Sequence, residues 1–138
     1  MIKNILLIII MTTVLSVNAM AQDDRKIPDL KGAWEGTAQM HYKEHGHMKP
    51  EGKVTELVVE SQEGQMFHGH HSWKHKISGK DTFSGVIDND GITFYMVGHE
   101  EGIYIGKFEN ADTFTLYILK PSGKSPRAGL ASYKRVKH

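Results

Sequence analysis

Four histidines and one tryptophan lie within the eight residues of the stretch HGHHSWKH, from His68 to His75. The whole chain has nine histidines, so this stretch is concentrated in imidazole. An imidazole ring can ligate a metal ion, hydrogen-bond a ligand or transfer a proton near neutral pH. The role open to each ring depends on the element that carries it and on the face of that element.

The stretch QMFHGHHSWKH reads as a β-strand, in which residues two apart share a face. Phe67 and Trp73 then lie on the same face as His71 and His75, and we expect that face to point into the protein. Apolar walls with a few convergent polar groups are typical of small-molecule pockets. The sequence therefore predicts a ligand pocket. Its predicted contacts are His71, Trp73 and His75 on this strand, and Tyr42 and Glu56 on neighbouring strands.

The opposite face of the same strand carries His68 and His70. Their H-x-H spacing suits one Zn²⁺ or Cu²⁺ ion when neighbouring strands supply further ligands. His45 and His47 repeat this spacing in KEHGHMK, on a connection that can approach the same strand. These four histidines are the predicted metal ligands. The cluster lacks the acidic residues that usually orient metal ligands, so adventitious binding of nickel or copper is the alternative to a dedicated site.

An enzyme is the main alternative to a binding protein. An interior histidine beside a tyrosine or glutamate can act as a general acid or base, which is what a small lyase or isomerase requires. The chain contains no Ser-His-Asp, Cys-His or metal-hydrolase motif, so no residue is assigned as catalytic. A metal-binding module built on the four predicted ligands is the third alternative.

The first residues, MIKNILLIIIMTTVLSVNAMAQ, carry an early lysine, an apolar run from Ile5 to Val17, and small residues at Ala19 and Ala21. This order is typical of a secretory signal peptide, here cleaved before Gln22. The apolar run is shorter than the roughly 20 residues of a membrane span. We therefore expect an exported bacterial protein, periplasmic or extracellular. No cysteine follows the signal to carry a lipid, so no stable membrane anchor is expected.

Removal of residues 1–21 from the 138 leaves 117 residues, enough for one domain. Residues 22–29, QDDRKIPD, are polar and read as a disordered leader, and residues 30–138 read as the domain. The removed segment holds one of the 17 Lys and Arg residues and none of the 16 Asp and Glu residues, which leaves a net charge near zero. Nucleic acid requires a concentrated basic surface, so it is not an expected partner.

From residue 30 onward, short runs rich in aromatic and β-branched residues alternate with turn residues, and helical spacing is scarce. The eight runs are KGAWEGTAQMHYK, KVTELVVES, QMFHGHHSWKH, TFSGVID, ITFYMVGH, IYIGKFE, TFTLYILK and LASYKRVK. Tight turn sequences such as DNDG and ENAD favour antiparallel pairing in chain order. Closure of such a meander removes its exposed edges. The sequence therefore predicts an all-β fold, an eight-stranded antiparallel up-and-down β-barrel.

The opening LKGAWEG, residues 30–36, resembles the Gly-x-Trp start of the calycin superfamily, which includes lipocalins, fatty-acid-binding proteins and avidins. The resemblance implies a calycin-like barrel in which a first-strand Trp plugs one end and a basic residue of the last strand packs across it. Trp34 corresponds to the plug and Arg135, in YKRVK, to the crossing residue. Their expected cation–π contact contributes about 0.5–2 kcal/mol. The Asn that usually follows this Trp in avidins is absent, so biotin binding is not implied.

Four glycines, Gly69, Gly85, Gly98 and Gly106, lie inside the predicted strands. Glycine in the middle of a strand marks sharp coiling of the sheet or space left beside the backbone. An eight-stranded barrel can hold one small ligand or be filled by its own side chains, so both interpretations stay open. The side chains expected to fill the interior are Phe83, Ile87, Phe94, Met96, Ile105, Phe114, Leu116 and Ile118.

Three consecutive runs, ITFYMVGH, IYIGKFE and TFTLYILK, are apolar on both faces. A barrel wall that meets water alternates apolar and polar residues more regularly. We therefore predict a homo-oligomer in which another copy of the chain covers this part of the wall.

Overall fold

The computed structural model describes residues 26–49, 51–52, 54–74, 78–100, 102–123 and 125–137. The predicted signal peptide, the first four residues of the predicted leader and His75 lie outside these described residues. Within them the backbone forms nine β-strands and no helix. It follows that the described part of the chain holds no helix with the length and apolar character that a membrane crossing needs.

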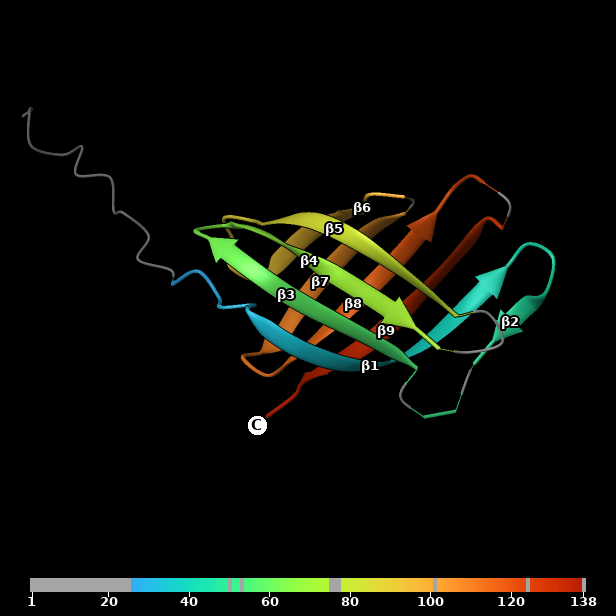
Figure 1. The fold of residues 1–138 in the computed structure, drawn as a ribbon, viewed down its shortest axis with the longest axis horizontal. Helices are drawn as coiled ribbons and strands as arrows, with labels where there is room; N and C mark the ends of the chain where they lie inside the picture. The colour runs from blue at the N-terminus through green and yellow to red at the C-terminus, as the bar shows by residue number, and fades with distance from the viewer. Residues whose placement is uncertain are drawn as a thin grey trace, which may run out of the picture.

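The nine strands pair in the order β2-β1-β3-β4-β5-β6-β7-β8-β9, and all pairs are antiparallel. They are β1 (Gly32–Tyr42), β2 (Gly46–Met48), β3 (Thr55–Glu63), β4 (Met66–Trp73), β5 (Gly79–Ile87), β6 (Thr93–Gly98), β7 (Ile103–Asn110), β8 (Thr113–Lys120) and β9 (Arg127–Arg135). A further pairing between β1 and β9 closes the sheet. The prediction of a closed eight-stranded antiparallel barrel is confirmed, with β2 as a short additional strand (Figure 1).

Strand β1 has two different neighbours on one of its edges. Its first part pairs with β3 as far as Gly36, which lies opposite Thr55. Its last part pairs instead with β2, where Met40 lies opposite Met48. Figure 1 shows β1 curving away from β3 towards β2. The wall is therefore tightly closed at the start of β1 and spread apart at its end.

Large apolar side chains fill the end of the barrel at which β1 starts. Alternation along each strand directs every second residue inward, and the buried apolar and aromatic ones form one cluster. Its largest fully buried members are Trp34, Phe83, Phe94, Phe114, Leu30, Leu57, Ile87, Met96, Leu116 and Val59. Six of the eight predicted filling residues are among them, and one of the six, Leu116, also lines the cavity described below. Ile105 is a correction: it faces outward between Tyr95 and Tyr117, and Tyr104 is the inward residue.

Glycine lies opposite phenylalanine in four cross-strand positions of this core, one of which is Gly98 opposite Phe83. Phe67 pairs with Gly85, and Phe94 pairs with Gly106. A Cβ atom at either glycine would collide with the phenylalanine ring opposite. Gly69 pairs with Phe83 in the same way. Gly85 and Gly106 therefore make room for rings of the protein itself, and Gly69 for the backbone of β3, and not for a ligand.

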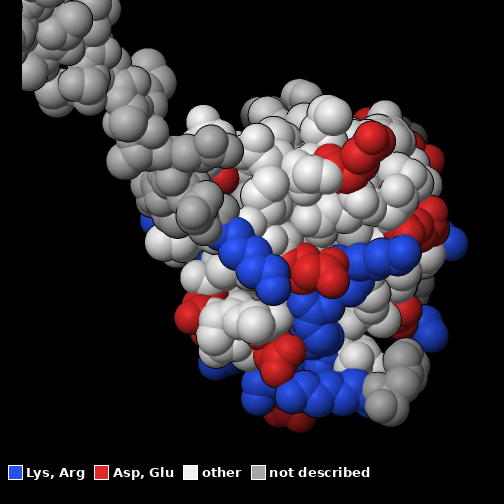
Figure 2. All heavy atoms as spheres, turned by 90° about the vertical axis from the view of Figure 1, so that its left-hand side faces the viewer, with Lys and Arg blue, Asp and Glu red and all other residues white. Residues whose placement is uncertain are grey.

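Trp34 and Arg135 close this end of the barrel. The Arg135 Cζ atom lies 4.1 Å from the centroid of the Trp34 ring. The Arg135 guanidinium also donates to the carbonyl oxygens of Lys31, Asp29 and Ala111. Figure 2 views this end and shows Lys and Arg side chains lying across it, interleaved with Asp and Glu.

The described part of the predicted leader also contacts this closed end. The Gln62 side-chain amide donates to the Pro28 carbonyl oxygen at 2.9 Å, and Arg135 donates to that of Asp29 at 2.6 Å. Backbone carbonyl groups before residue 30 therefore already contact the closed end of the barrel.

The outer surface of β5–β8 carries apolar side chains in cross-strand register. Val86, Tyr95, Ile105 and Tyr117 form one row, and Val97, Ile103 and Leu119 form a second. All of them except Ile105 are exposed. This outer surface is the one that the predicted homo-oligomer would cover, and self-association stays a prediction.

Candidate functional site

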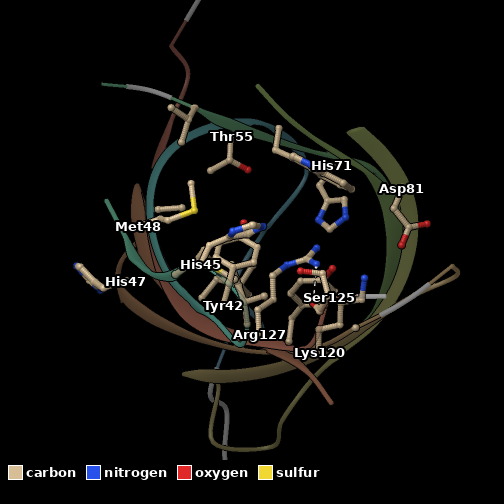
Figure 3. A pocket seen from close by; sticks show the side chains of 18 of the residues that line it. Tyr42, His45, His47, Met48, Thr55, His71, Asp81, Lys120, Ser125 and Arg127 are labelled. Carbon is tan, nitrogen blue, oxygen red and sulfur yellow. Dashed lines mark hydrogen bonds between the residues drawn. The ribbon is translucent and has the colours of Figure 1, made fainter. Parts of the chain in front are cut away.

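A cavity of about 840 Å³ occupies the end of the barrel opposite Trp34 (Figure 3). Its walls come from the ends of β1, β4 and β8 and from the starts of β3, β5, β7 and β9. The β1–β2 turn and β2 lie at the rim. Small-molecule sites typically measure about 300–1,000 Å³. The barrel is thus filled by its own side chains at one end and hollow at the other.

The cavity wall combines apolar and polar side chains. The apolar ones are Ala38, Met40, Met48, Val54, Leu116 and Ile118. The polar, charged and aromatic ones are Tyr42, His45, His47, Thr55, His71, Trp73, Asp81, Tyr104, Lys120, Ser125, Arg127 and Tyr133. His45 and His47 are exposed, so the cavity meets solvent at the β1–β2 turn.

His71 is the most deeply buried histidine of the wall, with 5% of its surface exposed. Its ring meets the rings of Trp73 and Tyr104 edge-on, with centroids 5.2 Å away in both cases. The Nε2 atom is buried and has no hydrogen-bond partner among the described residues. Figure 3 shows the ring directed into the pocket. Burial lowers the pKa of His71, so its imidazole is neutral at neutral pH.

Three charged side chains share the wall with His71. Asp81 lies opposite His71 in the β4–β5 register, is almost fully buried, and accepts hydrogen bonds from the backbone N–H of Glu100 at 3.2 and 3.3 Å. Lys120 and Arg127 face each other in the β8–β9 register. Lys120 is 8% exposed. Among the described residues, the cavity wall therefore carries two basic side chains and one acidic side chain.

Arg127 is held in position from two sides. Its Nη1 atom donates to the carbonyl oxygen of Ser125 at 3.2 Å. Its Cζ atom lies 5.6 Å from the centroid of the Tyr42 ring, a cation–π distance. Figure 3 shows Arg127 extending into the pocket from the wall across from His71. The guanidinium is thus directed at the same space as the His71 ring.

Tyr133 and Thr55 form the polar part of the cavity floor. The Thr55 hydroxyl donates to the carbonyl oxygen of Ser72 at 3.2 Å, so the Tyr133 hydroxyl, 2.8 Å away, donates to Thr55. Burial raises the pKa of Tyr133 to about 12, and the phenol stays protonated. This chain of bonds fixes the floor between β3 and β9.

The predicted ligand contacts divide into three groups. Tyr42, His71 and Trp73 line the cavity. His75 lies outside the described residues. Glu56 is a correction: it is exposed on the outer face opposite Ser72, because Thr55 is the residue of this segment that faces inward.

The predicted metal ligands lie on two separate surfaces. His45 and His47 line the cavity rim, whereas His68 and His70 lie on the outer face of β4. Glu60, which the sequence analysis missed, contacts His70 Nδ1 at 2.6 Å and lies 4.0 Å from His68 Nδ1. Within the described ranges no group of three or more His, Asp or Glu side chains is arranged to hold a metal ion. A zinc or copper site stays a prediction.

Three charged residues of the cavity wall were not predicted from the sequence: Asp81, Lys120 and Arg127. Lys120 could have been found, because it continues the inward alternation of Phe114, Leu116 and Ile118. Asp81 lies just before the predicted run TFSGVID, and Arg127 lies in the predicted connection KPSGKSPRAG. Both strands are longer than their apolar runs, so no hydrophobic signal marked these positions.

The lowered pKa of His71 predicts a loss of stability in acid. Burial is the largest cause of the shift, the Asp81 charge opposes it, and His70 and Arg127 add to it. The Tyr104 ring also packs on the imidazole. Above the ordinary pKa of about 6.5, the folded and unfolded chains both carry neutral imidazole. Below it only the unfolded chain binds the proton, so the free energy of unfolding falls until the lower folded-state pKa is reached.

Urea unfolding of the native sequence and of His71→Asn at pH 7.5 and pH 5.0 measures this contribution. We expect the variant, which cannot titrate at this position, to lose less stability than the native sequence between the two pH values. Equal losses in the two chains would show that burial of His71 does not drive the acid response.

No protein-family model and no curated protein matches this chain. Among solved structures it is similar to a redesigned β-barrel, with a TM-score of 0.52. The similarity covers 78% of this chain and 92% of that barrel, at 7% sequence identity. At such low identity the match supports the barrel fold and carries no information about the ligand.

Proposed function

We propose that this protein binds a small, partly apolar ligand in the cavity at the open end of the barrel. The observation that carries the proposal is the buried Nε2 atom of His71, which lacks a partner within the described part of the chain. Buried polar atoms are nearly always hydrogen-bonded, and exceptions call for an explanation. A ligand group seated in the cavity supplies the missing partner.

The contrast between the two ends of the barrel supports this proposal. At the closed end, rings and glycines interlock, with Phe67 against Gly85 and Phe94 against Gly106. At the open end, the inward residues leave about 840 Å³ between them. A barrel that served only as a packed scaffold would gain stability from larger apolar side chains at positions such as Ala38.

We also propose that the protein is exported and that its barrel is of the calycin type. The signal-like first residues support export. The position of Arg135 over the Trp34 ring supports the calycin assignment, since that resemblance implies a basic residue across the Trp plug.

A small lyase or isomerase is the second candidate function. The observation in its favour is that His71 is neutral at neutral pH and lies against Tyr104, a pair that can act as base and acid. Loss of turnover in His71→Ala with ligand binding retained would identify an enzyme, and unchanged turnover would exclude this histidine as the base.

A cavity-filling substitution tests the binding proposal directly. The probe is N-phenyl-1-naphthylamine, a neutral apolar dye whose fluorescence rises when it leaves water. Ala38→Phe places a ring in the cavity, whereas Thr37→Phe places the same ring on the outer face of the same strand. We expect Ala38→Phe to weaken dye binding about tenfold or more, equivalent to about 1.4 kcal/mol, and Thr37→Phe to leave it unchanged.

Ile118→Trp, with Tyr117→Trp as its control, repeats the comparison on β8 if Ala38→Phe does not fold. Circular dichroism establishes that each variant keeps its strands. Dye binding that is absent from the native protein, or that is equal in the inward and outward variants, would contradict a ligand site inside the barrel.

A further inference from the structure

We propose that the ligand is an organic anion, with an acidic group held by Arg127 and Lys120 against His71 and an apolar body along the inner wall. This inference rests on the proposed binding function and names the chemical class that the cavity selects. Of the described residues that line the cavity, Arg127 and Lys120 are basic and Asp81 is acidic.

Asp81, the acidic residue among the described lining residues, is already engaged by the backbone. Both oxygens of Asp81 accept from the Glu100 N–H, which lies in the connection between β6 and β7. Asp81 is buried in the wall itself and lies beside His71 on the neighbouring strand. Asp81 is therefore held within the wall, whereas the Arg127 side chain extends into the pocket (Figure 3).

The arginine has the geometry of an anion-binding group. A guanidinium presents its donors in a planar fork that matches a carboxylate, sulfonate or phosphate. The Ser125 carbonyl and the Tyr42 ring fix its orientation before any ligand arrives. A donor that is already oriented loses less conformational entropy on binding. Lys120, on the paired strand and almost buried, adds a second positive charge where screening by water is reduced.

His71 completes this polar region from the other wall. Its Nε2 atom is buried without a partner among the described residues, and its ring is directed at the space that Arg127 enters. An imidazole that carries a proton on Nε2 donates to an anionic oxygen. Below these groups, Leu116, Ile118 and Met40 form an apolar wall that suits the body of the molecule and offers nothing to a fully polar ion.

Two dyes that differ by one acidic group test the inference. The anionic probe is 8-anilinonaphthalene-1-sulfonate, and the neutral probe is N-phenyl-1-naphthylamine, which has the same ring system without the sulfonate. We expect the native protein to bind the sulfonate more tightly. We expect Arg127→Gln to weaken sulfonate binding about tenfold or more while changing neutral dye binding less than about twofold, since hydrogen bonds to charged groups are worth about one to two factors of ten.

The control variant is Lys134→Gln, which removes one positive charge from the outer face of the same strand β9. It should leave the affinity for both dyes unchanged. Lys120→Gln provides a second inward variant if Arg127→Gln does not fold, and Ala38→Phe should weaken both dyes, since both occupy the cavity.

The outcomes separate the inference from the function on which it rests. Selective loss of the sulfonate in Arg127→Gln supports the inference. Binding of both dyes with equal affinity, unchanged in Arg127→Gln and Lys120→Gln, overturns the anion class and leaves the binding function standing. Binding of neither dye by the native protein overturns both.

Discussion

Trp34→Ala is expected to destabilise the protein by about 3–5 kcal/mol, the range measured for Trp and Phe truncation in protein cores. Trp34 has no exposed surface and packs on Phe114 with ring centroids 4.7 Å apart. Its Nε1 atom donates to the Leu30 carbonyl oxygen at 2.9 Å, and its ring lies under Arg135. Truncation therefore removes packing, a hydrogen bond and a cation–π contact at the closed end.

Urea unfolding followed by far-ultraviolet circular dichroism measures this loss without depending on tryptophan fluorescence. Domains of this size have total stabilities of about 5–15 kcal/mol, so the variant is expected to be barely folded. Trp34→Phe keeps a ring in the core and loses the hydrogen bond, and it should fall between the native protein and Trp34→Ala. A loss below about 1 kcal/mol in Trp34→Ala would contradict the role of Trp34 as the plug of the barrel.

Gly69→Ala is expected to destabilise the barrel by about 1–3 kcal/mol, the usual cost of overfilling a packed core. A Cβ atom at Gly69 would collide with the Val58 carbonyl oxygen and come within 3.0 Å of the Phe83 ring. The collision involves backbone, which cannot swing away as a side chain can. Gly69 does not adopt a positive φ, so the cost is steric and does not arise from backbone strain.

His68→Ala is the matched control for this substitution, because His68 is adjacent on β4 and exposed on the outer face. It should change the free energy of unfolding by less than about 0.5 kcal/mol. Gly69→Ala would gain about 0.4–1 kcal/mol from the reduced entropy of the unfolded chain if it fitted without strain. A stabilised Gly69→Ala variant would therefore contradict the close packing of β3, β4 and β5.

The fold could be predicted from the sequence because two independent patterns agree. Period-two alternation identified the inward face of β4 from Phe67 and Trp73, and turn sequences such as DNDG placed neighbouring strands side by side. Strand β2 was missed because three residues, Gly46–Met48, carry no periodic signal. It pairs with the end of β1, where β1 no longer pairs with β3.

The candidate site was harder to predict, because it depends on strand ends and on register. His71 and Tyr42 were found on apolar-periodic strands. Asp81 and Arg127 lie where β5 and β9 extend beyond their apolar runs. From composition alone, both residues therefore fell in predicted connections between strands. Glu56 was predicted to face inward because the sequence does not fix the register between β1 and β3. In the structure Gly36 lies opposite Thr55, and Thr55 is the residue that faces the cavity. Cross-strand register is long-range information that no local pattern contains.

The most direct test of a ligand site inside the barrel is methyl-group NMR of the protein with bound N-phenyl-1-naphthylamine. Intermolecular nuclear Overhauser effects between dye protons and protein methyl groups show which surface the dye contacts. We predict contacts with the cavity-lining methyl groups of Val54, Leu116 and Ile118. Contacts confined to Val86, Val97 and Leu119, on the outer face, would contradict the proposed function.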